Sequence, residues 1–312
     1  MYKKLKVSLV IPAYNEQKLI KSTLENVPKT IDRVYVIDDK SSDKTIEVVE
    51  AKAKKDKKVK LIKHEKNAGP GQAIITGYKQ SLKDDYDIAV VVGGDNQMDL
   101  KDLDNFLEPI YKEEADYVKG NRWLWPSMGV MPKHRFLGNS MLSFMTKIAS
   151  GYWKIFDTQD GYTAISKKGL KTIDWDRAWK GYGYVSEWLI RMNVYGLRVK
   201  DVPRRPIYLK GERQSQINIG KYVLKVLPML IKGFFWRLKE KYIIRDFHPL
   251  VFFYLLGLLL LPLGLIYGSW LLWYRLFIGT ISVSNTILVS LLIITGFQSL
   301  FFAMLFDMQS SS

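Results

Sequence analysis

The 312-residue sequence predicts an α/β domain built on a mainly parallel sheet, followed by interfacial helices and a two-helix transmembrane hairpin. The first observation is that short apolar runs alternate with helical segments over roughly the first 120 residues, the order required by a parallel sheet covered by helices. The second is a pair of long, nearly uncharged stretches near the end of the sequence. These observations divide the chain into residues 1–218, 219–248 and 249–312.

Four apolar runs predict the strands of the sheet, at residues 7–11, 32–37, 59–62 and 88–92. Runs without regular polar alternation are typical of strands that are buried on both faces. Helices are expected between them, at residues 17–26, 43–56 and 72–82. No internal repeat interrupts this order.

The formal net charge of +16 is concentrated before residue 249, because residues 249–312 contain only Arg275 and Asp307 as charged side chains. A domain with this positive charge is expected to bind nucleic acid, phosphorylated substrates or anionic lipid. The chain has no cysteine, which excludes a disulfide framework, a thiol nucleophile and a thiolate metal site. Three scattered histidines, His64, His134 and His248, argue against a histidine-rich metal site.

Two stretches are long enough to cross a bilayer, at about residues 250–273 and 281–306, since a span needs roughly 20 apolar residues. Pro262 lies inside the first stretch, where a membrane helix tolerates it. A pair of buried core helices is the alternative, although these runs exceed the usual length of a globular helix. Cations precede the first span, so the positive-inside rule predicts a multi-pass protein of the cell membrane whose large domain is cytoplasmic. The N-terminus shows no apolar stretch long enough for a signal peptide.

Residues 219–248 alternate lysine and arginine with large apolar side chains. This pattern predicts one or two helices lying in the headgroup region, with anionic membrane lipid as a partner. Pro228 and Gly233 argue against a single straight helix. A solvated helix that packs on the domain is the alternative.

Residues that directly follow the four predicted strands are rich in carboxylates, amides and glycine, at positions 12–16, 38–43, 67–71 and 93–97. In open α/β sheets, ligands bind beyond the carboxyl ends of the strands. Carboxylates there can accept hydrogen bonds from a base or ribose, or hold a divalent ion. Each motif also has an ordinary structural explanation: Ser42 or Asp43 can cap the next helix, and the loop at Gly69 to Gly71 can be a plain turn. That loop is neither a dinucleotide fingerprint nor a P-loop.

Taken together and in order, these motifs resemble family 2 glycosyltransferases, which have the GT-A fold. The motifs are Pro12-x-Tyr14-Asn15-Glu16, Asp38-Asp39-x-Ser41-x-Asp43-x-Thr45, Asn67-x-Gly69-x-Gly71-x-Ala73 and Asp95-x-Gln97. Later segments resemble the dolichyl- or polyprenyl-phosphate branch, which is typified by dolichol-phosphate mannose synthases. Those segments are Lys119-Gly120-Asn121-Arg122, Met131-Pro132-x-x-Arg135-x-x-Gly138-Asn139, Asp157-x-Gln159-x-Gly161-Tyr162 and Gly183-Tyr184-Val185-Ser186-Glu187.

The resemblance implies a role for each group of residues. Nucleotide binding would fall to Pro12, Tyr14, Glu16, Asp38, Asp39, Asn67 and Gly71. Asp95 and Gln97 would hold Mg²⁺ or Mn²⁺, and Asp95, Arg122 and Arg135 would be the catalytic residues. The acceptor phosphate would be bound by Arg122, Arg135, Arg213 and Ser215, while Asp157, Gln159 and Glu187 would contact the sugar or support the site. Arginine suits phosphate because it forms bidentate, permanently charged contacts. A lipid phosphate is already anionic, so catalysis reduces to positioning and to stabilising the leaving diphosphate.

Two positions depart from the family pattern. The family usually has Asp-x-Asp where this chain has Gly93-Gly94-Asp95, so one metal-side carboxylate is missing. A weaker metal site, an altered sequence or a degenerate enzyme would each account for this. The family also commonly has lysine after the serine that is Ser215 here, where this chain has Gln216. Arg213 or Lys210 would then supply the missing charge.

The expected reaction is transfer of a sugar from a nucleotide-diphosphate sugar to dolichyl or polyprenyl phosphate, with a UDP-sugar of glucose or N-acetylglucosamine favoured over GDP-mannose. A degenerate relative that binds without transfer, and a transferase with another lipid acceptor, are the alternatives. A processive synthase usually has Gln-x-x-Arg-Trp, and here Lys119 stands in place of that glutamine. A tethered nucleic-acid binder is disfavoured because many cations cluster beside the spans, so no nucleic acid partner is expected. A homo-oligomer stays open.

Overall fold

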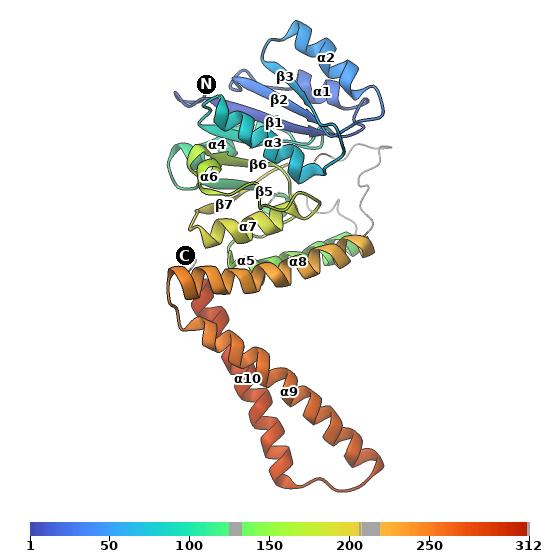
Figure 1. Ribbon diagram of the computed structural model, residues 1–312, viewed down its shortest axis with the longest axis vertical. Helices are drawn as coiled ribbons and strands as arrows, with labels where there is room; N and C mark the ends of the chain where they lie inside the picture. The colour runs from blue at the N-terminus through green and yellow to red at the C-terminus, as the bar shows by residue number, and fades with distance from the viewer. Residues whose placement is uncertain (125–132, 206, 208–218, 311–312) are drawn as a thin grey trace. The chain divides into compact units, whose positions relative to one another are not determined.

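The computed structural model describes residues 1–124, 133–205, 207 and 219–310, with only the backbone of residues 133–137 and 219–223. The chain forms two compact units, Met1–Phe234 and Phe235–Ser312. The first unit holds the sheet and the helices that cover it, and the second holds two long helices (Figure 1).

A seven-stranded sheet forms the centre of the first unit, in the order β3-β2-β1-β4-β6-β5-β7. The strands are β1 Val7–Ala13, β2 Arg33–Asp38, β3 Val59–Lys63, β4 Ile88–Val91, β5 Tyr117–Asn121, β6 Thr163–Ser166 and β7 Val199–Pro203. Only β6 runs antiparallel to its neighbours, β4 and β5. The mainly parallel sheet predicted from the sequence is confirmed, and the four expected strands lie within two residues of the predicted bounds.

Helices cover both faces of this sheet (Figure 1). One face carries α1 Ile20–Glu25, α2 Thr45–Lys55 and α4 Leu103–Tyr111, and the other carries α3 Pro70–Lys83, α6 Lys167–Thr172 and α7 Tyr184–Val194. Central strands therefore bury side chains on both sides: Leu9 and Ile11 join one core, and Val10 joins the other. A Cβ at Gly77 of α3 would lie 2.2 Å from Val10 Cγ1, so glycine lets this helix approach the sheet closely.

Two 3₁₀ turns and one longer helix also connect the strands. They are η1 Leu100–Asp102, η2 Arg122–Leu124 and α5 Lys133–Ser150. The helix η2 directly follows β5, and β6 begins after a loop that follows α5. Residues at the end of β5 and in that loop are therefore brought beside the carboxyl ends of the parallel strands.

Helix α8, Ile219–Lys239, is one continuous helix with Pro228 inside it, which is one of the two arrangements expected from the sequence. Pro228 is exposed. Gly233 leaves room for the Ile190 side chain of α7, because a Cβ at position 233 would lie only 2.5 Å from Ile190 Cδ1. Met229 and Leu230 are buried. Leu224, Ile231 and Phe235, at helical spacing of seven and four residues, form a second apolar stripe that is exposed, with Lys225 and Lys232 beside it.

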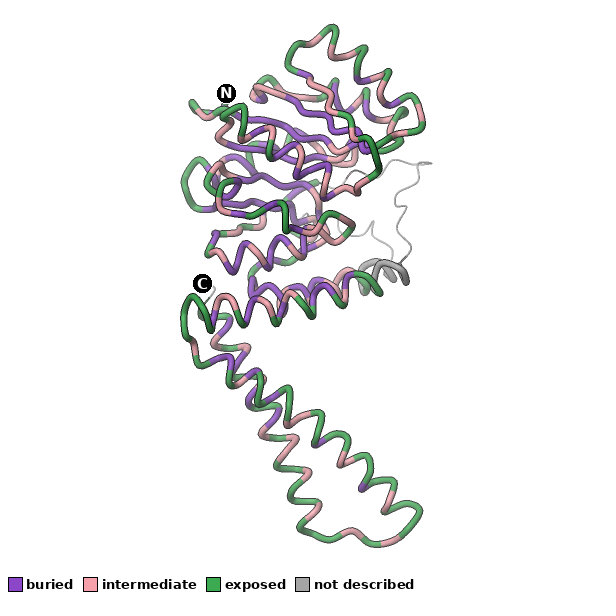
Figure 2. The backbone as a smooth tube through the Cα atoms, in the orientation of Figure 1, coloured by how far each residue is buried: buried purple, intermediate pink, exposed green. Residues whose placement is uncertain are grey.

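The second unit contains α9 Leu250–Phe277 and α10 Val283–Ser310, which follow the π-helical turn η4 Glu240–Arg245. Both helices are long and apolar enough to cross a membrane, with mean hydropathies of 2.4 and 2.2 in their most apolar windows. Their side chains are mostly exposed (Figure 2), which a pair of buried core helices would not show. At 1.5 Å per residue each helix is about 42 Å long, more than a hydrocarbon core of about 30 Å.

Glycines allow α9 and α10 to pack closely as a hairpin. A Cβ at Gly296 would lie 2.7 Å from the backbone nitrogen of Leu261, and one at Gly257 would lie 2.6 Å from Leu300 Cγ. Small residues at such a seam are typical of helices that associate within lipid. Four aromatic side chains then gather near the end of α9, namely Tyr267, Trp270, Trp273 and Tyr274. Rings of this kind are enriched at membrane–water interfaces.

One ion pair of the second unit is fully buried. Arg237 donates from both terminal nitrogens to Asp307, at 2.7 and 2.8 Å, and neither side chain is exposed. The hydroxyls of Tyr242 and Tyr254 also donate to this carboxylate, at 2.7 and 3.3 Å. The pair therefore joins residues of α8, η4, α9 and α10 around one carboxylate.

Candidate functional site

A pocket of about 910 Å³ opens at the carboxyl ends of β1, β2 and β4. It is lined by residues from the four segments that follow the strands and from one later loop: Pro12, Ala13, Tyr14, Asn15, Glu16, Gln17, Lys18, Leu19, Asp39, Asp43, Asn67, Ala68, Gly69, Pro70, Ala73, Asp95, Gln97, Gly181 and Tyr182. The parallel strands end at one edge of the sheet, and this brings residues more than 80 positions apart into one site.

The segment after β1 is held by the segment after β2. Asn15 has a φ of 58°, and its backbone amide donates to Ser41 Oγ at 3.0 Å. The Glu16 amide donates to Thr45 Oγ1 at 2.8 Å. Asp43 accepts from the Thr45 amide, the first amide of α2, at 2.9 Å, although the N-cap position itself is Lys44. Asp43 also accepts from the Gln17 amide. These bonds hold Tyr14 and Glu16 at the pocket wall.

The two neighbouring aspartates after β2 have different surroundings. Asp39 lines the pocket and accepts from the backbone amides of Ala68 and Gly69, at 2.9 and 2.8 Å, while its Oδ1 lies 2.8 Å from His64 Nδ1. It therefore holds the loop after β3 against the site. Asp38 is buried and does not line the pocket; its Oδ2 accepts from the Ser41 amide, and its Oδ1 has no hydrogen-bond partner among the described residues.

Two loops face each other at the other wall of the pocket. Gly69 has a φ of 91°, and a Cβ at Gly71 would lie 2.7 Å from the Lys180 carbonyl oxygen. Gly71 therefore serves the close packing of the loops and does not itself line the pocket. Glu187 fixes the loop at 179–182: it accepts from the Trp179 amide at 3.0 Å and pairs with Arg191 at 2.6 Å. Burial raises the pKa of Glu187.

Asp95 and Gln97 both line the pocket, after β4, whose four residues are all buried. Asp95 Oδ1 accepts from the Gln97 amide at 3.2 Å, which makes a short turn with both side chains at the same wall. Burial raises the pKa of Asp95. A Cβ at Gly93 would lie 2.9 Å from Asp95 Oδ1, so a side chain there would directly contact this carboxylate.

The donor set at this turn fits a hard divalent cation only if a ligand completes it. Asp95 and Gln97 offer one carboxylate and one amide, which are oxygen donors that Mg²⁺ and Mn²⁺ accept. Within the described part of the chain, no group of three or more His, Asp or Glu side chains is arranged to hold a metal. The diphosphate of a nucleotide would have to supply further oxygens.

A buried network of alternating charges lies next to this turn. Arg204 donates to the Gln97 carbonyl oxygen at 2.9 Å and to Asp160 Oδ2 at 2.7 Å. Arg122 forms a two-point pair with Asp157, at 2.6 and 2.8 Å, and its Nε lies 3.3 Å from Asp160. Burial opposes ionisation of Asp157, but Arg122 prevails and lowers its pKa to about 2. The guanidinium of Arg122 is thus held in one orientation, with 19% of its side chain exposed.

The remaining predicted residues fall outside this arrangement. The side chain of Arg135, and all of Arg213 and Ser215, lie outside the described residues. Gln159 donates to Thr158 and Ser186 and does not line the pocket. Sequence reasoning missed Arg204 and Asp160. Asp160 lies inside a quoted motif and was passed over, whereas nothing in the motifs indicates Arg204.

The chain is similar to known glycosyltransferases. Residues 8–174 match the model described as glycosyl transferase family 2. The chain is 34% identical over 243 residues to the UDP-N-acetylglucosamine–dolichyl-phosphate N-acetylglucosaminyltransferase of Methanococcus voltae, covering 73% of this chain and 96% of that one. It is 29% identical to the undecaprenyl-phosphate mannosyltransferase of Micrococcus luteus, covering 64% and 82%.

Solved structures match the fold. One is glucosyl-3-phosphoglycerate synthase from Mycobacterium tuberculosis in complex with Mn²⁺, UDP and phosphoglyceric acid, with a TM-score of 0.55 and 19% identity. The match covers 74% of this chain and 79% of that one. At this identity the likeness concerns the fold, and it agrees with the expected GT-A architecture.

Proposed function

The chain belongs to glycosyltransferase family 2, in the branch of the dolichyl- and polyprenyl-phosphate sugar transferases, and on that basis we propose that it transfers a sugar from a UDP-sugar to dolichyl or polyprenyl phosphate. The observation that carries this proposal is the pocket that Tyr14, Asp39 and Asp95 line together, from the segments that follow β1, β2 and β4. The name of the Methanococcus relative supports UDP-N-acetylglucosamine as the first donor to test.

Donor binding would follow the layout of the pocket. Tyr14 and Asp39 lie at the end formed by β1 and β2, where base and ribose would bind, and Asp95 with Gln97 lies by β4, where the diphosphate would bind. A divalent cation held there would neutralise charge on the leaving diphosphate. Arg204 would act as a positioning residue, because it holds the Gln97 carbonyl oxygen and so the turn that carries Asp95.

In the proposed step, an oxygen of the acceptor phosphate forms a bond to the anomeric carbon, the bond from that carbon to the diphosphate breaks, and UDP leaves. The nucleophile is already anionic, so the residues need to position it rather than deprotonate it. Arg122 is proposed to orient the acceptor phosphate. The pair with Asp157 fixes its guanidinium beforehand, which lowers the entropy lost on binding. The acceptor KM of Arg122→Lys tests this role, because a KM equal to that of the parent would exclude it.

Gly93 supports a second candidate, a relative that binds the nucleotide-sugar without transfer. The residue leaves Asp95 as the single carboxylate that residues 93–97 contribute to the pocket. Such a protein would still bind a UDP-sugar, because the segments after β1, β2 and β3 are complete. Transfer and binding must therefore be measured separately.

The test uses the full-length protein in detergent with dolichyl phosphate or undecaprenyl phosphate and radiolabelled UDP-N-acetylglucosamine, UDP-glucose or GDP-mannose. We expect label in the organic phase with a UDP-sugar and Mn²⁺, and one UDP released per sugar transferred. Dolichol without phosphate is the matched control and should receive no sugar. If calorimetry shows that UDP binds but none of the three donors gives transfer, the protein is the inactive relative and the proposed transferase activity is rejected.

Membrane topology gives a separate prediction. The cations at Lys225, Lys232 and Lys239 precede the first span and are exposed, whereas the opposite end of the hairpin carries only Arg275, in the last turn of α9, so both termini are proposed to be cytoplasmic. The chain lacks cysteine, so single cysteines can be placed at Thr280 and at Lys57 without a background signal. An impermeant maleimide added outside intact cells should label only the Thr280→Cys protein. Labelling of Lys57→Cys instead would reverse the orientation.

A further inference from the structure

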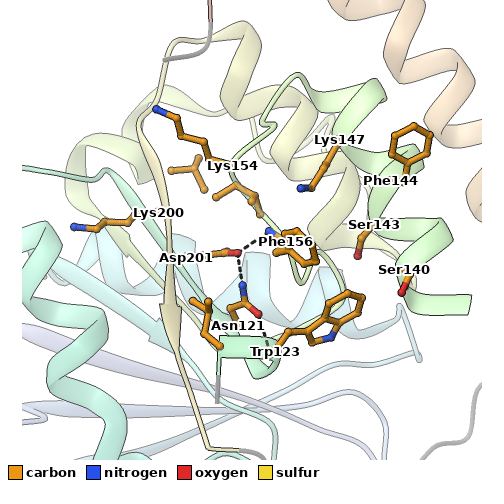
Figure 3. Close-up of a pocket in the computed structure, with 13 residues that line it drawn as sticks. Asn121, Trp123, Ser140, Ser143, Phe144, Lys147, Lys154, Phe156, Lys200 and Asp201 are labelled. Atoms are coloured by element: carbon orange, nitrogen blue, oxygen red, sulfur yellow. Dashed lines mark hydrogen bonds between the residues drawn. The ribbon is translucent and has the colours of Figure 1, made fainter. Parts of the chain in front are cut away.

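A second pocket, of about 840 Å³, lies in the first unit and shares no lining residue with the donor pocket. It is formed by the end of β5, η2, the middle of α5, the loop before β6 and the start of β7: Asn121, Trp123, Leu124, Ser140, Ser143, Phe144, Lys147, Lys154, Ile155, Phe156, Val199, Lys200 and Asp201. Figure 3 shows these side chains around the cavity. A volume of this size is usual for small-molecule sites, which range over about 300–1,000 Å³.

The walls of this pocket are mainly apolar. Phe144 and Phe156 are about half exposed, and the Trp123 and Phe156 rings meet edge to face with centroids 5.2 Å apart. Leu124 is also exposed, at 56%. Exposed aromatic and aliphatic side chains that converge on a hollow mark a binding site more often than a plain surface.

One cation faces this apolar surface. Lys147 of α5 points toward Phe156, with its Nζ 4.2 Å from the ring centroid (Figure 3). None of the described carboxylates lies within ion-pair distance of Nζ. Burial lowers the pKa of Lys147, and Asp201 opposes that effect. An ammonium that is partly desolvated and lacks a carboxylate partner favours an anionic ligand.

Two other cations, Lys154 and Lys200, and one carboxylate also line the pocket. Lys154 and Lys200 extend away from Phe156 (Figure 3), and Lys200 pairs with Glu114 at 2.6 Å. Asp201 is the single carboxylate among the lining residues, and its Oδ2 accepts from Asn121 Nδ2 and from the Phe156 amide. Lys147 is therefore the lining cation whose ammonium group faces the aromatic wall.

The chain connects this pocket to the donor site. Asn121 and Trp123 flank Arg122, which contacts Asp157 and Asp160, and Asp160 contacts Arg204, which holds Gln97. A ligand in the second pocket would thus lie beside the arginine proposed to orient the acceptor phosphate.

We propose that this pocket binds the phosphate-bearing end of the polyprenyl acceptor, with Lys147 pairing with the phosphate and Trp123, Phe144 and Phe156 surrounding the first isoprene units. The inference rests on the proposed function and names the acceptor subsite. An apolar chain with a single anionic head matches both the Lys147 charge and the apolar walls of the pocket. A free phosphate would match the charge but not contact the walls, and a polar sugar would not match the apolar walls.

The test measures acceptor and donor KM separately, using farnesyl phosphate as a short acceptor, for the parent, Lys147→Met, Lys147→Arg and Lys200→Met. Removing the lysine charge should raise the acceptor KM roughly tenfold, as expected for loss of a charge-assisted contact, and leave the donor KM unchanged. Lys147→Arg should recover most of the affinity. Lys200→Met is the matched control on the rim of the same pocket and should behave like the parent.

Calorimetric titration of the acceptor in the absence of any donor tests the acceptor subsite independently of sugar transfer. Farnesyl phosphate should bind the parent, and both inorganic phosphate and farnesol should bind at least about tenfold more weakly, because each supplies one half of the ligand. Equal binding of inorganic phosphate, an unchanged Lys147→Met, or an equal loss in Lys200→Met would overturn the subsite. A parent that binds farnesyl phosphate through Lys147 but transfers no sugar would overturn the proposed function and leave the subsite standing.

Discussion

Asp95→Ala should lower kcat by about 100- to 1,000-fold, the range seen when a group that stabilises transition-state charge is removed. The carboxylate lines the donor pocket at the end of β4, and it is the single acidic side chain that the turn with Gln97 contributes there. UDP binding should weaken far less, because Tyr14 and Asp39 remain. Asp99→Asn is the matched control, since Asp99 caps η1 and does not line the pocket. Full activity of Asp95→Ala, or activity undiminished by excess chelator, would exclude the metal assignment.

The reverse substitution, Gly93→Asp, tests the same site by adding a ligand. The new Cβ would lie 2.9 Å from Asp95 Oδ1, so the two carboxylates must adjust and repel each other unless a cation lies between them. We expect the variant to unfold at a lower temperature than the parent in chelator, and to regain stability with Mn²⁺ through linked binding. The Mn²⁺ concentration for half-maximal activity should fall about tenfold. A variant whose stability does not respond to Mn²⁺ would contradict the assignment.

Arg237→Leu should destabilise the hairpin unit by about 3–5 kcal/mol, because it leaves Asp307 buried without its counter-charge. Asp307→Leu should cost a similar amount for the same reason. The double variant Arg237→Leu/Asp307→Leu should be more stable than either single variant, since no buried charge is then left unpaired. Lys239→Met is the control, as Lys239 is an exposed cation of the same helix.

The measurement for these variants is unfolding of the purified protein in mixed micelles, followed by denaturant titration. Tyr242 and Tyr254 also donate to Asp307, so some coupling energy remains in Arg237→Leu. Single variants that lose no more stability than the double variant would show that the ion pair is not the main contact at this point.

The sequence predicted the first four of the seven strands, because β1, β2 and β4 are almost fully buried and form apolar runs. It also predicted where their ligand-binding residues meet, because parallel strands end at one edge of the sheet. That rule alone brought Pro12, Asp39, Asn67 and Asp95 together, and the structure places all four in one pocket. It could not tell which neighbour faces the pocket. Successive residues of an extended chain point to opposite sides, so Asp38 is buried while Asp39 lines the site.

The ion pairs between residues far apart in the chain could not be predicted from the sequence. Arg204 contacts Asp160 across 44 positions, and Arg237 contacts Asp307 across 70, and no local periodicity records either pairing. For a related reason, the sequence left open whether α8 is one helix or two. Gly233 weakens an isolated helix, yet in the folded chain its missing side chain makes room for Ile190.

The two apolar sides of α8 also determine where the polypeptide can be cut. A fragment that stops at residue 218 would uncover Ile190 and lose Val226, Met229 and Leu230, all of which are buried in the full-length chain. A fragment that keeps α8 retains that cover but carries Leu224 and Ile231 exposed to water. Production of the sheet domain without its anchor would therefore need residues through Phe234 together with detergent, or polar replacements at those two exposed positions.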